Sequence, residues 1–215
     1  MVIKHCSFDH KGGYYFYRVH NLKLDKLCNG FKSLKSYLDF VFDNCPDEYF
    51  NNGPRGSSLR FNFGFDKIKI KGHEVSKLTD LGLKENSERY KTPHSRVQVF
   101  MLENDGHTVA VEVPIWIKPK ELMNFKDFFK TEYPLTGHID ILRVEGNKIW
   151  VWDYKPNAKY EKYADVQVYF YALMLSKRTG IDLDNFRCGY FDEKNAFMFK
   201  PNIDFVTKYK TLKSF

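Results

Sequence analysis

The chain has 215 residues, of which 43% are hydrophobic and 17% aromatic, so it holds enough apolar material for a folded core and is not a disordered segment. Its 34 lysines and arginines against 27 acidic residues give a net charge of +7, which fits a polyanion-binding face as well as an ordinary basic surface. The longest uncharged apolar run, Val168–Leu175, is much shorter than the roughly 20 residues of a membrane-spanning helix, and no apolar signal-peptide core is present near the N-terminus. We therefore expect a soluble, cytoplasmic protein without a membrane partner.

Apolar spacing predicts a mixture of strands and helices. The aromatic and basic first 30 residues predict a strand or hairpin, and apolar residues at helical spacing predict a helix over 31–42. The Asn-, Gly- and Pro-rich segment 51–58 predicts a loop, interpreted as the boundary between an N-terminal appendage (residues 1–60) and the rest (61–215). The elements expected after it are a strand or loop entering a helix (68–83), strands (97–102 and 108–117), a short helix or loop (125–129), strands (135–144 and 148–154), a long helix (160–178) and a final hairpin (186–191 and 196–199).

This order of elements indicates an α/β or α+β fold with a mixed central sheet flanked by helices. The four cysteines show no spacing typical of a zinc site or of an iron–sulfur cluster. Lysines between residues 118 and 130 alternate with aromatic residues, which suits contacts to phosphates and unpaired bases. The plainer alternative is that these aromatic residues belong to the core and the lysines to a solvated rim.

Two acidic residues face each other if the strands around Gly146-Asn147 form a tight hairpin, for which Gly-Asn is a favoured two-residue loop. Pairing of the residues that flank this loop places Asp140 directly opposite Asp153, where Cβ atoms are about 5 Å apart. Lys155 lies on the same face as Asp153, because side chains alternate along a strand. A slip of one residue in the register would separate the two acids.

Opposed carboxylates repel each other, so one of them should have a raised pKa unless a cation is bound. Their oxygen atoms suit Mg²⁺ or Mn²⁺, and two acids, a lysine and such an ion are the groups needed for attack of a metal-activated water on a phosphodiester. The alternative is a surface hairpin with a weak Asp–Lys ion pair. Apolar residues on both faces of the two strands argue against that alternative, because they indicate a buried pair.

Three motifs then follow in order: Gly137-His138-Ile139-Asp140, Asp153-Tyr154-Lys155, and Gln167 with Tyr171 four residues later. This order resembles the PD-(D/E)XK nuclease superfamily in its RecB-like exonuclease branch, over roughly Lys71 to Pro201. The resemblance implies a restriction-endonuclease-like core. It also implies the roles of five residues: Asp140 and Asp153 as metal ligands with the Tyr154 carbonyl as a third, Lys155 as the catalytic lysine, and Gln167 and Tyr171 as catalytic-site residues that contact substrate or the lysine.

The family places a further His or Glu ligand on an earlier helix. His73, which follows a glycine, is the first choice for that ligand and Glu74 the second. Glu112 resembles an acidic residue found one strand before the first aspartate, although it could instead be an exposed position on an edge strand, as nearby Pro114 suggests. His138 is expected to border the pocket.

The resemblance implies a Mg²⁺- or Mn²⁺-dependent DNA nuclease of DNA repair or recombination, with a RecB-like exonuclease as the first expectation. A structure-selective endonuclease such as a Holliday junction resolvase, which needs a homodimer to cut two strands, is one alternative. A non-catalytic nucleic-acid-binding module is another. The expected partners are DNA (single-stranded, duplex ends or branched), a second copy of the chain, and a separate helicase or recombination protein, since no G-x-x-x-x-G-K-[ST] motif occurs. Residues 1–60 are expected to bind DNA, contact a partner or dimerise.

Overall fold

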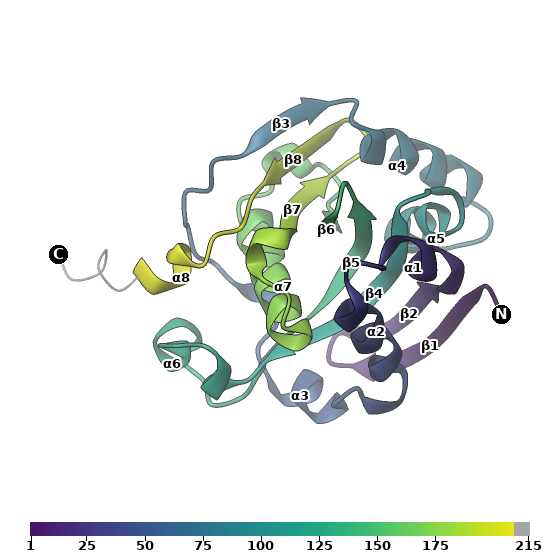
Figure 1. The fold of residues 1–215 in the computed structure, drawn as a ribbon. Coiled ribbons are helices and arrows are strands. Elements are labelled where there is room, and N and C mark those ends of the chain that lie inside the picture. The colour runs from purple at the N-terminus through teal and green to yellow at the C-terminus, as the bar shows by residue number, and fades with distance from the viewer. Residues whose placement is uncertain (209–215) are drawn as a thin grey trace.

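The strands of the protein join in one mixed sheet (Figure 1). The computed structural model describes residues 1–208. In chain order its strands are β1 (Ile3–His10), β2 (Gly13–His20), β3 (Ile68–Lys71), β4 (Thr108–Ile117), β5 (Leu135–Glu145), β6 (Lys148–Tyr154), β7 (Phe186–Phe191) and β8 (Asn195–Phe199). Their order in the sheet is β1-β2-β4-β5-β6-β7-β8-β3, with β6 and β7 parallel and the other neighbours antiparallel.

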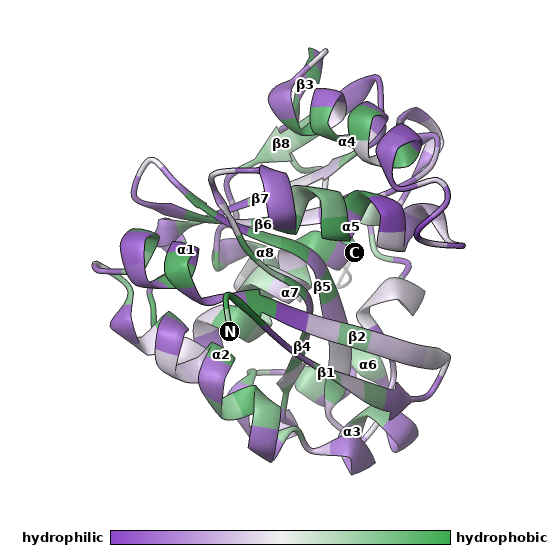
Figure 2. Cartoon of the chain, turned by 90° about the vertical axis from the view of Figure 1, so that its right-hand side faces the viewer, coloured by the Kyte–Doolittle hydropathy of each residue, from purple (hydrophilic) through white to green (hydrophobic). Residues whose placement is uncertain are grey.

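Helices cover both faces of this sheet. They are α1 (Asn21–Leu27), α2 (Lys32–Asn44), α3 (Asp47–Asn52), α4 (Glu74–Glu85), α5 (Pro93–Asn104), α6 (Phe125–Phe129), α7 (Ala164–Thr179) and α8 (Asp204–Lys208). Figures 1 and 2 show α2 and α5 on opposite sides of the sheet. The surface helices α2 and α4 each carry hydrophobic and hydrophilic residues (Figure 2), whereas α7 is buried from Ala164 to Leu175.

Alternation along β6 divides the core into two layers. Ile149 and Val151 belong to the cluster that includes α2 and α7, whereas Trp152 and Tyr154 belong to the cluster on the side of α4 and α5. The sheet is therefore buried on both faces, which explains why β6 is almost entirely apolar until Asp153. In the described part of the chain, every helix is too short or too polar to cross a bilayer.

The expected hairpin register is confirmed. Glu145 pairs with Lys148, and the ladder continues without a shift to Ile141 and Trp152. The turn residues between the strands have φ angles of 57° and 55°, the left-handed conformation that a two-residue hairpin of this hand requires.

The helical and strand predictions are confirmed for most of the chain, including α2, α7 with its left-handed Gly180 cap, and the final hairpin. The strand predicted over 97–102 is wrong, because these residues lie in α5. The start of α5 carries a helix signal: the Thr92 side chain accepts a hydrogen bond from the Ser95 amide, and Pro93 follows it at the first helical position. The apolar residues of α5 stand at 97 and 99–102, almost without interruption, and this run lacks the spacing typical of a surface helix. The helix predicted over 160–178 begins later, at Ala164.

Residues 1–60 share the sheet and the core with the rest of the chain. β2 pairs with β4 at Arg18↔Val111 and Val19↔Ala110, and the fully buried Tyr17 and Leu38 belong to the same core cluster as α7. The role predicted for this segment stays a prediction. Of the predicted range 61–215, the last seven residues lie outside the described residues.

Candidate functional site

One pocket collects side chains from β2, α5, β4, β5, β6 and α7. Within it the structure brings together six of the residues expected from the sequence: Glu112, Asp140, Asp153, Lys155, Gln167 and Tyr171. His138, which was expected to border the pocket, also lines it. The pocket therefore joins the three sequence motifs, although they lie on two strands and a helix.

The carboxylate of Asp153 is the centre of a network of polar contacts. Lys155 Nζ lies 2.7 Å from its Oδ2, and Gln167 Nε2 donates a 2.7 Å hydrogen bond to its Oδ1. The same Gln167 amide donates to the Tyr171 hydroxyl at 3.1 Å, as expected for residues one helical turn apart. Gln167 and Tyr171 thus fix the orientation of the buried carboxylate.

Asp140 occupies the neighbouring strand position. Its Oδ2 accepts a 2.9 Å hydrogen bond from the Tyr154 amide, so the backbone of Tyr154 also borders the acidic pair. The role of the Tyr154 carbonyl as a metal ligand stays a prediction.

Glu112 faces Asp140 from β4 with an unusual backbone. Its neighbours Val111 and Val113 pair with Ile141 and Ile139, which places Glu112 across from Asp140. Its φ of 52° is left-handed, a conformation that costs a non-glycine residue about 1–3 kcal/mol and is concentrated at functional sites. Gln98 Nε2 donates a 2.6 Å hydrogen bond to its carboxylate.

Burial and mutual repulsion raise the pKa values of two of these acids. Burial, followed by the charge of Asp140, raises the pKa of Asp153 to about 7, despite the opposing charge of Lys155. Burial and the charge of Asp140 likewise raise the pKa of Glu112 to about 8. Burial alone would lower the pKa of Lys155, but Asp153 and Asp140 outweigh it and raise that pKa, so Lys155 stays an ammonium ion. The acids therefore favour a bound cation, while the lysine keeps its charge.

The glycine of the first motif has a packing reason. A Cβ on Gly137 would lie 2.3 Å from a ring carbon of Tyr171, and a Cβ on Gly56 would lie 2.5 Å from the same atom. The tyrosine ring is therefore held between β5 and the loop before β3. That loop is tied to β5 by the Thr136 amide, which donates to the Pro54 carbonyl at 3.0 Å.

The structure adds pocket residues that the sequence analysis missed. His94 Nε2 lies 3.8 Å from Asp140 Oδ2, and Gln98 follows it by one helical turn on α5. Gln98 was missed because 97–102 was predicted as a strand, and His94 lies before that segment, where no element was predicted. The Thr92-Pro93 helix start could have revealed both. Arg55 also lines the pocket from the segment interpreted as a boundary loop, and its guanidinium lies 5.0 Å from the centre of the Tyr15 ring.

The structure does not place His73 and Glu74 in this pocket, which corrects their expected role as its upstream metal ligands. His73 caps α4, where its Nδ1 accepts a 3.3 Å hydrogen bond from the Val75 amide. Glu74 Oε2 binds the buried Arg143 guanidinium at 2.6 Å. Both residues lie at the start of α4, whereas the helix that reaches the pocket is α5.

Two groups of three side chains in residues 1–208, both outside this pocket, have ligating atoms that all lie within 4.8 Å of one another: His10–Cys45–Asp47 and Glu74–His107–Glu145. The second group surrounds Arg143, which contacts all three residues and already supplies the positive charge. In the first group, the His10–Asp47 contact is a 2.9 Å hydrogen bond. Neither group includes a residue of the pocket that holds Asp140 and Asp153.

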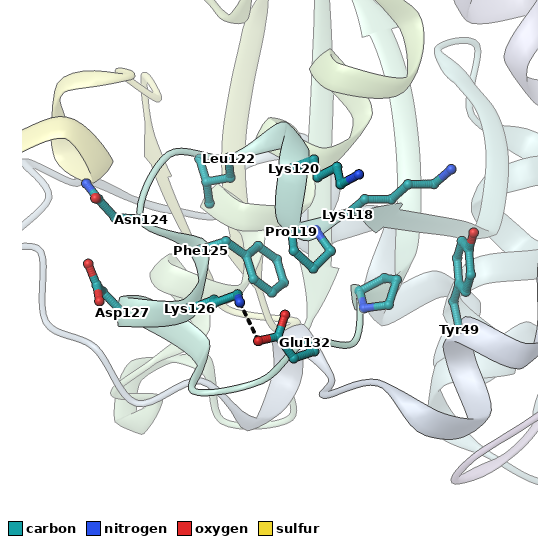
Figure 3. Close-up of a pocket in the computed structure, with 11 residues that line it drawn as sticks. Tyr49, Lys118, Pro119, Lys120, Leu122, Asn124, Phe125, Lys126, Asp127 and Glu132 are labelled. Atoms are coloured by element: carbon teal, nitrogen blue, oxygen red, sulfur yellow. Dashed lines mark ion pairs between the residues drawn. The ribbon is translucent and has the colours of Figure 1, made fainter.

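A further pocket is lined by the segment that runs from the end of β4 through α6. Lys118, Lys120 and Lys126 are among its lining residues (Figure 3). Lys126 Nζ is 2.5 Å from a carboxylate oxygen of Glu132, and the ring of Phe125 is buried in the core. Phe128 and Trp116 are buried as well. The aromatic residues of this region thus belong to the core, as the plainer alternative had it.

Comparison with known proteins agrees with this arrangement. The family model described as the PD-(D/E)XK nuclease superfamily matches residues 74–208. The chain belongs to the PD-(D/E)XK nuclease superfamily. No curated protein matches it. A solved structure titled "Crystal structure of SSO0001" is similar with a TM-score of 0.40 and 12% sequence identity, over 85% of this chain and 82% of that chain.

Membership of the PD-(D/E)XK superfamily agrees with the mixed sheet and flanking helices of a restriction-endonuclease-like core. Members of the superfamily use divalent metal ions. The pocket fits such an ion, because Asp140, Asp153 and Glu112 offer hard oxygen ligands and two of them carry raised pKa values that a cation would lower. The matched segment begins at α4, so β2 and Arg55 contribute to the pocket from outside it.

Proposed function

We propose that the protein is a metal-dependent nuclease that hydrolyses phosphodiester bonds of DNA, with Mg²⁺ or Mn²⁺ as its ion. The observation that carries this proposal is the convergence of Asp140, Asp153 and Lys155 in one pocket. A non-catalytic binding module would gain nothing from burying Asp153 with a raised pKa beside a second carboxylate, since the arrangement is unfavourable without a cation.

Each pocket residue has a role in this reaction. Asp140, Asp153 and Glu112 would hold the ion, which when bound would supply positive charge to the transition state and lower the pKa of water. Lys155 remains protonated and stabilises the negative charge that develops on the phosphate. Gln167 positions Asp153 through its hydrogen bond to Oδ1.

Within this class we propose a RecB-like exonuclease, supported by the order of the three motifs along β5, β6 and α7. DNA is its proposed partner. Circular substrates distinguish this exonuclease from a structure-selective endonuclease, because an exonuclease needs a free end.

The test is cleavage of linear and circular DNA, single-stranded and duplex, in Mg²⁺, in Mn²⁺ and in EDTA. We expect ion-dependent cleavage of linear DNA, and a loss of about 100-fold or more in Asp140→Asn, Asp153→Asn and Lys155→Ala. Asp80→Asn on the exposed side of α4 is the matched control and should retain full cleavage. Glu74→Gln is a second control, since Glu74 lies outside the pocket.

Undiminished cleavage by Asp153→Asn would contradict the proposed site. Binding of DNA without cleavage of any substrate in either ion would favour the non-catalytic module. Cleavage of covalently closed circles would assign an endonuclease.

A further inference from the structure

The first half of β2 carries exposed aromatic residues beside the pocket. Tyr14 and Phe16 are 68% and 49% exposed, whereas Tyr17 and Val19 on the opposite face of β2 are fully buried. Tyr14, Phe16 and Arg18 alternate along β2 and therefore point to the same side. All three line the pocket that holds the catalytic acids.

Part of this row also borders a second hollow. Phe16 and Arg18 also line a neighbouring hollow between β1 and α5, which Tyr90 and His5 complete. The two hollows share these side chains, so the hollow beside β1 adjoins the pocket of the catalytic acids.

The charges along the surface suit a polyanion. Arg18 is shared by both hollows, and Arg55 lines the pocket side. The acidic residue of the outer hollow, Glu103, is paired with Arg89 at 2.9 Å. The surface thus combines exposed aromatic rings with guanidinium groups, and the Arg18 guanidinium lies 5.4 Å from the centre of the Phe16 ring. These are the two elements of single-strand binding: rings stack on bases, and cations hold the backbone.

We propose that the outer face of β2, defined by Tyr14, Phe16 and Arg18, is a stacking platform that guides an unpaired DNA strand into the pocket; this rests on the proposed nuclease function. Alternate side chains of a strand are about 7 Å apart, so each ring has room for one base. In a duplex the base faces are covered by their neighbours and cannot lie on these rings. The platform therefore selects single strands, such as overhangs or unwound ends.

The test is the binding of fluorescent oligo(dT) and of a duplex of the same length, measured by anisotropy in EDTA so that no cleavage occurs. The double variant Tyr14→Leu/Phe16→Leu removes the rings and keeps apolar bulk on an exposed strand. We expect at least about tenfold weaker binding of oligo(dT). Duplex binding should change by less than about twofold, because the phosphate contacts are kept.

The matched control is Phe40→Leu/Tyr133→Leu, two aromatic residues that are 47% and 55% exposed outside both hollows. It should bind oligo(dT) as the wild type does. Phe16→Trp keeps a stacking ring and should retain tight binding. Replacing the bases of the oligonucleotide by abasic sites should remove the difference between wild type and the double variant.

Unchanged oligo(dT) binding by the double variant, or equal weakening for duplex and single strand, would overturn the platform. Tighter binding of oligo(rU) than of oligo(dT) by the wild type would also overturn it. So would a wild type that is dimeric in light scattering and a double variant that is monomeric with unchanged DNA affinity, because the face would then be a contact between copies. The two proposals fail separately: ring-dependent binding without metal-dependent cleavage removes only the nuclease, and cleavage insensitive to both rings removes only the platform.

Discussion

Glu112 combines a left-handed backbone, burial and a carboxylate partner across the sheet, three conditions that are each unfavourable for an acidic residue. Such a residue persists only where its surroundings hold it, here the Gln98 amide and the pairing of its two neighbours in β4. An ionised carboxylate at this position is unfavourable in the absence of a cation. This unfavourable free energy should be measurable as a dependence of stability on pH.

We predict that Glu112→Gln changes the pH dependence of the free energy of unfolding in EDTA. The folded-state pKa of about 8 lies above the usual value of 4.5, so between these pH values the folded chain binds more protons than the unfolded one. The stability of the wild type should therefore fall relative to the variant as pH rises from 5 to 8, by up to about 1.4 kcal/mol per pH unit. Urea unfolding at a series of pH values measures this difference.

Addition of Mn²⁺ should reduce that difference at pH 8, because a bound cation stabilises the ionised carboxylate. Parallel stability curves for the two proteins in EDTA would show that Glu112 is not a strained acid in the folded state.

At the scale of the element, the β5–β6 hairpin illustrates what could be predicted from the sequence. Its turn residues and the two-residue period determine the register, so the neighbourhood of Asp140, Asp153 and Lys155 follows from local rules. His94 and Gln98 could not be placed in this way, because the apolar residues of α5 do not follow the spacing of a surface helix. The contribution of Arg55 depends on packing between distant segments, which no local pattern encodes.

We predict that Gly137→Ala impairs the site through α7 without touching a charged group. The added methyl group would overlap the Tyr171 ring, which Gly56 blocks from the other side. Overpacking of this kind costs about 1–3 kcal/mol of stability, and displacement of Tyr171 disturbs the Gln167 hydrogen bond to Asp153. The midpoint temperature of thermal unfolding and the rate of DNA cleavage should both decrease.

The double variant Gly137→Ala/Tyr171→Phe separates steric from polar effects, because it keeps the ring and removes only the hydroxyl. It should be no more stable than Gly137→Ala. If the clash is with the ring, Gly137→Ala should cost less stability in a Tyr171→Ala background than in the wild type. Normal stability of Gly137→Ala itself would refute the close packing.

At the scale of the whole molecule, all the strands of the described residues form one sheet, in which each strand is hydrogen-bonded to the next from β1 at one edge to β3 at the other. The composition of segment 51–58 suggested a boundary there, yet Arg55 pairs with Thr136 and Leu38 packs in the cluster of α7. Composition signals the absence of regular structure in a loop, but it carries no information about what the loop packs against. Mixed architecture could be predicted from the alternation of elements, and the position of the N-terminal hairpin beside β4 could not.

We predict that residues 61–215 alone do not fold cooperatively. Removal of residues 1–60 strips the core of Tyr17, Val19, Leu34 and Leu38, all fully buried, at about 1.5–3 kcal/mol each. The sum is comparable with the total stability of an ordinary domain. Urea unfolding followed by tryptophan fluorescence should show no sharp transition for this fragment, and a cooperative transition would establish residues 1–60 as a separate appendage.

The wedge formed by Tyr171 between Gly56 and Gly137 makes three far-separated stretches of the chain mechanically interdependent. A displacement of the loop at Gly56 would therefore move the Tyr171 ring, and with it the Gln167 amide that hydrogen-bonds to the Asp153 carboxylate. The position of the Asp153 carboxylate thus depends on the position of the loop at Gly56.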